Sequence, residues 1–156
     1  MRLLKLAPLG ALMVALASSP SFAQDAAARN LAQEEANRTL VLDFYNNFFN
    51  KHQVAEASKV MVDNYRQHNP HVPDGKAPMV GYFTDHFKKN PQAQAKVVRS
   101  AVDGDLVYLH VHSTVSPEDR GVAIVDIFRV KDGKIVEHWD VIQPIPEKAA
   151  NDNTMF

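Results

Sequence analysis

Histidine and aspartate are the side chains of this sequence best suited to act on a ligand. Among 156 residues there are seven histidines and no cysteine, which excludes a disulfide scaffold, a thiolate zinc site and a cysteine nucleophile. The strongest grouping is Asp126, His138 and Asp140, which fall in two consecutive apolar segments near the C-terminus. A carboxylate beside an imidazole in such surroundings shifts pKa values and orients a base.

The turn between these two segments decides whether the three side chains meet. A three-residue loop over 131–133 places Asp126 opposite His138, with Asp140 one residue pair away on the same face. A two-residue turn over 132–133 directs Asp126 away from both. We favour the three-residue loop, and we expect either an acid/base site or a structural Asp-His pair that joins two strands.

A second polar group lies on the strand expected at 106–115. Alternate residues of a strand share a face, so Tyr108, His110 and His112 lie on one face and apolar residues occupy the other. The polar face either lines a cavity or meets water. These three residues are candidate substrate contacts.

His110 and His112 also have the spacing of a transition-metal pair, with His138 or Asp126 as further ligands. The pair resembles the start of a cupin metal motif, but Glu118 lies one residue too far along the chain for that motif. We therefore expect no metal.

Three more candidate substrate contacts lie in the polar stretch 64–75, which holds two prolines and is expected to be irregular. Polar residues of loops carry function more often than framework residues, which makes Tyr65, His68 and His71 candidates. In the structural alternative, Asn69-Pro70 forms a turn and His68 caps a neighbouring segment.

The hydrophobic pattern predicts the elements that hold these residues. Apolar residues recur with helical spacing in three segments and then alternate with a period of two in four segments separated by turn sequences. The expected helices are 31–51, 53–61 and 77–89, and the expected strands are 95–101, 106–115, 122–130 and 135–145. Helices followed by antiparallel strands are typical of an α+β domain with helices on one face of the sheet.

The first 23 residues have the features of a secretory signal peptide. Basic residues precede an apolar run at 6–17, and small residues lead up to Ala23, where cleavage is expected. The run is shorter than the ~20 residues that span a bilayer. We expect a single exported domain, 24–156, in the periplasm or outside the cell. The formal charge of −1 argues against nucleic acid or an anionic membrane as the partner.

Several segments together resemble a known family. The sequence AIVDIFRVKDGKIVEHWDVIQ at 123–143 resembles the end of SnoaL-like proteins, the polyketide-cyclase branch of the nuclear transport factor 2-like superfamily. The segments YRQHNPHVPDG and GDLVYLHVHS and the tail AANDNTMF resemble a SnoaL-like subfamily described as predicted aldol-condensation enzymes. The resemblance implies a cone-shaped, barrel-like α+β fold in which three N-terminal helices pack on a curved antiparallel sheet and enclose a pocket, commonly as a homodimer.

The resemblance also implies a reaction. SnoaL-like cyclases close a ring by an aldol reaction without a metal or an organic cofactor, and an aspartate is the acid/base. By resemblance Asp140 takes the place of that aspartate. We expect Asp140 to exchange a proton next to a carbonyl of a small molecule in an apolar pocket, while Asp126 and His138 tune it and His110 and His112 position the substrate oxygen. The alternatives are a non-catalytic small-molecule-binding protein and a metal-dependent enzyme that uses His110 and His112.

Overall fold

The polypeptide is described from residue 29 to residue 156 in a computed structural model. The predicted signal peptide, 1–23, lies outside the described residues. The helices are α1 (Leu31–Tyr45), which continues as a π-helical turn to Asn50, α2 (Val54–Ala57), which continues as a 3₁₀ turn to Val60, and α3 (Lys76–Lys89). The strands are β1 (Met61–Gln67), β2 (Gln94–Asp103), β3 (Leu106–Thr114), β4 (Val122–Lys131) and β5 (Lys134–Pro144).

The sheet is mixed and open, with the strand order β1-β5-β4-β3-β2. Strands β2 to β5 pair antiparallel, as expected, but β1 adds a fifth strand parallel to β5. The predicted irregular stretch from residue 64 is wrong for 64–67, which complete β1, and the predicted antiparallel pairing is wrong for β1 alone. Asp63 and Asn64 hid the strand because both residue types are depleted in strands. An edge strand tolerates them since one of its sides has no partner.

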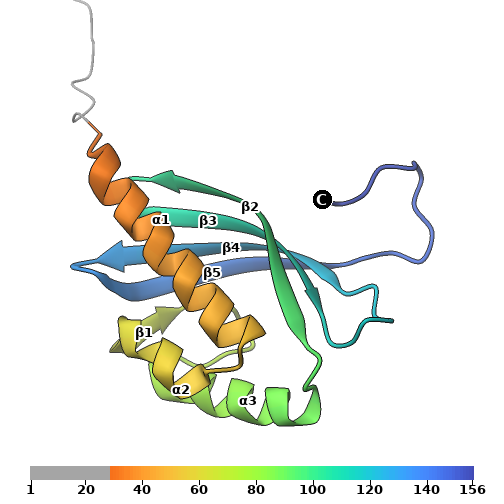
Figure 1. The fold of residues 1–156 in the computed structure, drawn as a ribbon, viewed down its shortest axis with the longest axis horizontal. Coiled ribbons are helices and arrows are strands. Elements are labelled where there is room, and N and C mark those ends of the chain that lie inside the picture. Colours follow the sequence, from red (N-terminus) through yellow and green to blue (C-terminus); the bar gives the residue numbers. More distant parts are fainter. Residues whose placement is uncertain (1–28) are drawn as a thin grey trace, which may run out of the picture.

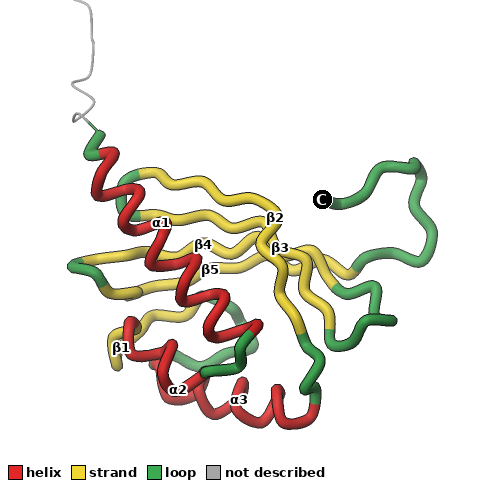
Figure 2. The backbone as a smooth tube through the Cα atoms, viewed as in Figure 1, coloured by secondary structure: helices red, strands yellow, loops and turns green. Residues whose placement is uncertain are grey.

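The helices cover one face of this sheet, which confirms the predicted α+β arrangement. Figure 1 shows α1 crossing in front of the sheet, with α2 and α3 beyond its lower edge. The side chain of Asn30 caps α1 by accepting a hydrogen bond from the backbone N–H of Gln33 at 3.1 Å, which satisfies one of the free donors of the first turn. Figure 2 shows β2 bending past the end of α1, and the register of β2 shifts between Val97 and Arg99.

The core lies between α1 and the inner face of the sheet. Val107, Leu109 and Val111 of β3 are almost fully buried there, so the alternation predicted for this strand is confirmed. Aromatic residues from the helices complete the core: the rings of Phe44 and Phe128 are 5.8 Å apart. None of the helices within 29–156 is long and apolar enough to cross a membrane.

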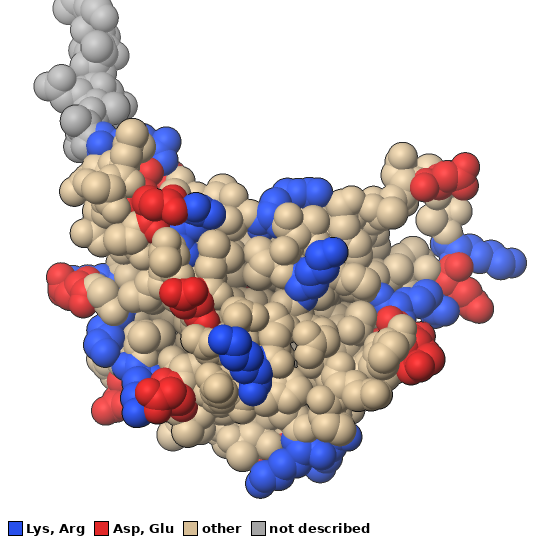
Figure 3. Space-filling model, in the orientation of Figure 1, with Lys and Arg blue, Asp and Glu red and all other residues tan. Residues whose placement is uncertain are grey.

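Charged side chains are interspersed by sign on the face shown in Figure 3. Lysine and arginine lie beside aspartate and glutamate, and no large area of this face carries a single sign. This distribution agrees with the formal charge of −1.

Candidate functional site

A cavity of about 370 Å³ lies between α3, the end of α1 and the inner face of β4 and β5. The loop that follows β1 closes part of it. Most lining residues are apolar. Hydrogen bonds join five of the polar ones into the polar end of the cavity: Gln67, Asn69, Asp126, His138 and Asp140. The lining consists of Tyr45, Phe49, Gln67, Asn69, His71, Val72, Pro73, Pro78, Met79, Tyr82, Phe83, Ile124, Asp126, Phe128, His138, Asp140 and Ile142.

The hairpin of β4 and β5 brings the three predicted residues to the polar end through a turn and a bulge that differ from the predicted loop. Lys131 pairs with Lys134, so the turn has two residues, not three. Both turn residues, Asp132 and Gly133, have positive φ, as a type I′ hairpin turn requires. The predicted three-residue loop is therefore wrong.

A β-bulge in β5 nevertheless brings Asp126 to the same face as His138 and Asp140. Val130 pairs with Ile135 but Arg129 pairs with Glu137, so β5 holds one extra residue, Val136, at this point. An extra residue in one strand reverses which face the following side chains occupy. Asp126 consequently pairs with Asp140, and His138 shares their face.

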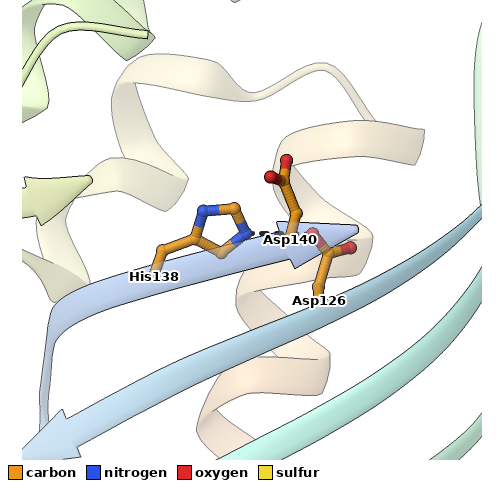
Figure 4. Close-up of side chains that lie close together, drawn as sticks. All are labelled: Asp126, His138 and Asp140. Atoms are coloured by element: carbon orange, nitrogen blue, oxygen red, sulfur yellow. Dashed lines mark hydrogen bonds and ion pairs between the residues drawn. The ribbon is translucent and has the colours of Figure 1, made fainter. Parts of the chain in front are cut away.

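Asp126 and His138 form a buried pair in which every polar atom has a partner. His138 Nε2 lies 2.9 Å from Asp126 Oδ1, and the hydroxyl of Tyr45 donates to Asp126 Oδ2 at 2.7 Å. Asp126 is 5% exposed and His138 is 7% exposed. Figure 4 shows Asp126 on β4 facing His138 and Asp140 on β5.

Gln67 fixes the tautomer of His138. The amide oxygen of Gln67 accepts the backbone N–H of Asn69 at 3.0 Å, which identifies that atom as the oxygen. The same oxygen lies 2.9 Å from His138 Nδ1, so Nδ1 must carry a proton because an amide oxygen only accepts. A hydrogen bond between His138 Nε2 and Asp126 Oδ1 then requires one further proton in this pair.

Asn69 holds Asp140 in an equally defined way. Its amide nitrogen donates to both carboxylate oxygens of Asp140, at 2.9 and 2.7 Å. Its amide oxygen accepts the backbone N–H of His71 at 2.9 Å, which fixes the orientation of the amide. Asp140 is only half-buried, and it presents an oriented carboxylate to the cavity.

Burial raises the pKa of Tyr45 well above its ordinary value, and the negative charge of Asp126 raises it further. A deprotonated phenol beside two carboxylates would place a third negative charge in a region with little water. The Tyr45 hydroxyl therefore stays a hydrogen-bond donor to Asp126 throughout the physiological pH range.

The candidate residues from the stretch 64–75 lie in three different places. His71 lines the cavity. Tyr65 is fully buried, with its ring 6.4 Å from that of His138, and it does not reach the cavity. His68 lies on the outer face of the sheet, where it stacks on Trp139 at 4.7 Å and bonds to Glu137 at 2.9 Å. The structure thus separates Tyr65 and His68 from the cavity.

Tyr108, His110 and His112 also lie on the outer face, because their neighbours on β3 fill the core beneath the helices. His112 Nε2 bonds to the backbone oxygen of Arg120 at 2.8 Å, and His110 Nδ1 lies 2.9 Å from Arg99. The expectation that these residues position a substrate oxygen in the pocket is corrected: a sheet separates them from it.

The residues that could hold a metal are the cluster itself. Asp126, His138 and Asp140 offer ligand atoms within 4.8 Å of one another. Two ligands about 2.1 Å from a tetrahedral zinc ion lie about 3.4 Å apart, farther than the 2.9 Å between His138 Nε2 and Asp126 Oδ1, which is a hydrogen-bond distance. Within residues 29–156, the His110 and His112 pair is not joined by a third such ligand.

Sequence reasoning missed Tyr45, Gln67 and Asn69. Tyr45 lies within the expected helix 31–51, and the hydroxyl of a buried tyrosine requires a polar partner. That requirement was the available signal. Gln67 and Asn69 flank His68, and their partners lie 71 residues away in the sequence, so nothing local indicated them.

Comparison with known proteins places this geometry in a family context. No curated protein matches the chain. Among solved structures, a proposed ketosteroid isomerase from Kribbella flavida is 19% identical, with a TM-score of 0.62 over 76% of this chain and 86% of the other. A SnoaL-like protein of unknown function from Burkholderia thailandensis is 12% identical, with a TM-score of 0.61 over 70% and 96% of the two chains.

A proposed polyketide cyclase from Bacillus cereus is 21% identical, with a TM-score of 0.55 over 69% of this chain and 74% of the other. These likenesses confirm the cone-like α+β fold of nuclear transport factor 2-like proteins, with a sheet that does not close. The model of the SnoaL-like domain matches residues 41–138, which is more than half of the chain. The protein therefore belongs to the SnoaL-like family.

Proposed function

We propose that this protein is an exported SnoaL-like enzyme that performs cofactor-free acid/base chemistry on a small carbonyl compound. The observation that supports it is the composition of the cavity: one oriented carboxylate, Asp140, and one hydrogen-bonded pair, Asp126 and His138, at the end of a mostly apolar space. General acid/base catalysis needs a base and an acid that reach the same substrate from fixed positions.

In the proposed reaction the Asp140 carboxylate removes a proton from the carbon next to the substrate carbonyl. The electron pair of the broken C–H bond forms the enolate. The proton of the hydrogen bond between Asp126 and His138 moves to the developing oxyanion, and Tyr45 keeps its hydrogen bond to Asp126 meanwhile. In both outcomes the enol O–H returns its proton to the Asp126–His138 pair as the carbonyl forms again. Transfer of the Asp140 proton to another carbon gives an isomerase, and attack of the enol carbon on a second carbonyl, whose oxygen takes the Asp140 proton, gives an aldol product.

The surroundings favour this chemistry in two ways. The apolar lining excludes water, which strengthens the interaction of charged groups with a developing oxyanion. The single amide of Asn69 orients Asp140 without a positive charge that would weaken it as a base. The predicted signal peptide supports export, and the family resemblance supports a homodimer.

The test is exchange of carbon-bound hydrogen in deuterated buffer, followed by proton NMR on a panel of neutral ketones and enones. We expect the wild-type protein to accelerate exchange next to the carbonyl of at least one class. We expect Asp140→Asn to reduce that rate by about 10²- to 10⁴-fold, because the amide keeps the shape but cannot accept the proton.

Asp43→Asn, an exposed substitution on α1, is the matched control and should leave the rate unchanged. Equal exchange by the wild-type and Asp140→Asn proteins would refute the assignment. Exchange that requires an added divalent metal and stops with a chelator would also refute it and would make the cluster a metal centre.

A further inference from the structure

The mouth of the cavity carries large apolar side chains that are exposed. Tyr82 on α3 and Ile142 near the end of β5 both line the cavity, yet they are 61% and 49% exposed. Exposed apolar side chains at the opening of a cavity indicate a surface that a ligand or a partner covers. A ligand confined to the interior would leave both in water.

A continuous series of aromatic rings connects this mouth to the polar end. Tyr45, which donates to Asp126, has its ring 4.4 Å from that of Phe49. Phe49 lies 5.1 Å from Phe83 in an edge-to-face arrangement, and Phe83 lies 5.0 Å from Tyr82 in the same way. All four rings line the cavity, so an apolar body that begins beside Asp126 meets aromatic surface along the whole way to the exterior.

The charges of the lining restrict the polar end of such a ligand. Two carboxylates and one histidine, His138, lie there, and none of the described lining residues is lysine or arginine. With the proton that their hydrogen bond requires, Asp126 and His138 are neutral together, so the cluster keeps only the negative charge of Asp140. A carboxylate or phosphate group would meet that like charge with no lysine or arginine to compensate it. The polar end must therefore be uncharged.

We propose that the cavity takes a neutral amphiphile: an uncharged carbonyl or hydroxyl end reaches Asp140 and His138, and an apolar body longer than the cavity leaves between Tyr82 and Ile142. Tyr82 and Ile142 are then the residues that select for length. The inference rests on the proposed function only for the identity of the polar end, since contact at the mouth requires no turnover.

The experiment is a binding series with straight-chain methyl ketones from 2-hexanone to 2-undecanone, measured by isothermal titration calorimetry. Each methylene that leaves water strengthens binding by about fourfold. We expect the wild-type affinity to rise through the whole series. In Tyr82→Ala with Ile142→Ala, the short ketones should bind as in the wild type and the gain should stop for the longest ones.

Val141→Ala is the matched control. Val141 is the neighbour of Ile142 on β5, it is 71% exposed, and it does not line the cavity, so the series should be unchanged. Decanoate, which carries the same nonyl chain as 2-undecanone, should bind at least tenfold more weakly because its end is anionic.

The proposal would be overturned if the affinity stopped rising at the same chain length in the wild type and the double variant, or if decanoate bound as tightly as 2-undecanone. It would also be overturned if the double variant changed the oligomeric state of the protein but not its affinities for the ketone series, because Tyr82 and Ile142 would then contact another subunit and not the ligand. Ketone binding with the expected length dependence but without hydrogen exchange would refute the proposed function and leave this inference intact. Exchange without length dependence would do the reverse.

Discussion

The hydroxyl of Tyr45 has a single partner, Asp126 Oδ2, in a region without access to water. Burial and the charge of Asp126 raise the pKa of Tyr45 in the folded protein, whereas the unfolded chain keeps a value of about 10. A folded pKa above the unfolded one contributes stability that is fully present below pH ~10 and is lost as the pH rises further, because only the unfolded chain then releases the proton.

Tyr45→Phe tests this contact at both ends of the pH range. At pH 7 we expect the free energy of unfolding to fall by about 1–3 kcal/mol, because Asp126 loses a donor that nothing replaces. Above pH 10 we expect the variant to lose less further stability than the wild type, since it has one phenol fewer to ionise on unfolding. Urea unfolding at pH 7 and at pH 10.5 measures both effects.

Tyr82→Phe, at an exposed position, is the control and should follow the wild type at both pH values. If Tyr45→Phe and the wild type lost stability equally between pH 7 and 10.5, the raised pKa of Tyr45 would be contradicted. Part of the alkaline loss should persist in the variant because burial raises the pKa of Tyr65 as well.

The three clustered residues were predictable from the sequence and their partners were not. Asp126, His138 and Asp140 lie close together in the chain on strands whose alternation is visible, so a short-range argument reaches them. Tyr45 lies 81 residues from Asp126 in the sequence. Only the packing of α1 across the sheet brings the two together, and no periodicity encodes that packing.

At the scale of elements, the alternation of polar and apolar residues predicted correctly which face of β3 is buried, but it did not predict how β4 and β5 pair. The polar and apolar faces of β3 are as predicted, because burial acts on every second residue. The prediction favours a three-residue turn where the hairpin has the two-residue alternative, since Asp132-Gly133 suits both lengths equally well, and it omits the bulge at Val136. The wrong turn length and the omitted bulge each shift the pairing by one residue, so together they leave Asp126, His138 and Asp140 on one face as predicted.

Two glycines give opposite expectations for the same substitution. Gly121, just before β4, has φ of +76°, and an added Cβ would lie 2.0 Å from the backbone oxygen of Ser113. Gly81 lies within α3, and an added Cβ would meet nothing within 4 Å. We expect Gly121→Ala to cost about 3 kcal/mol or more and Gly81→Ala to stabilise by about 0.5–1 kcal/mol.

Urea unfolding of both variants at neutral pH provides the measurement, with Gly81→Ala as the control for the effect of an added methyl group alone. A neutral Gly121→Ala would show that the entry to β4 has another arrangement from the one described.

At the scale of the whole molecule, the C-terminal tail returns to the sheet. The N–H of Ile145 donates to the backbone oxygen of Gly121 at 3.1 Å, and the ring of Phe156 then stacks on His112 at 4.5 Å. Figure 1 shows the intervening chain as an excursion beyond the end of β5. The outer face of β3 therefore holds the tail, and His112 contacts the tail and not the cavity.

Deletion of Met155 and Phe156 tests this docking. We expect the melting temperature to fall by about 3 °C, the shift that ~1 kcal/mol produces in a domain of this size, while ketone binding stays unchanged because the tail and the cavity lie on opposite faces. Lys148→Ala, in the exposed part of the tail, should leave the melting temperature unaltered. A deletion without thermal effect would contradict the docking of Phe156.

The arrangement of helices on one face of a sheet was predictable from the order of periodicities alone. The parallel strand β1 was not, because its pairing with β5 joins residues about 70 positions apart and its own residues favour a loop. The consequence is local to the site: β1 ends at Gln67, which holds His138, so the missed strand is also the one that sets the histidine tautomer.

The extra residue Val136 makes chain length, not composition, the property that this hairpin must conserve. A single-codon deletion between the turn and His138 would exchange inside and outside for the rest of β5, so that Trp139 would enter the cavity and both His138 and Asp140 would leave it. Paired insertions or deletions would preserve the chemistry. Natural variants of this hairpin should therefore differ in length by even numbers of residues, even where the residues themselves diverge.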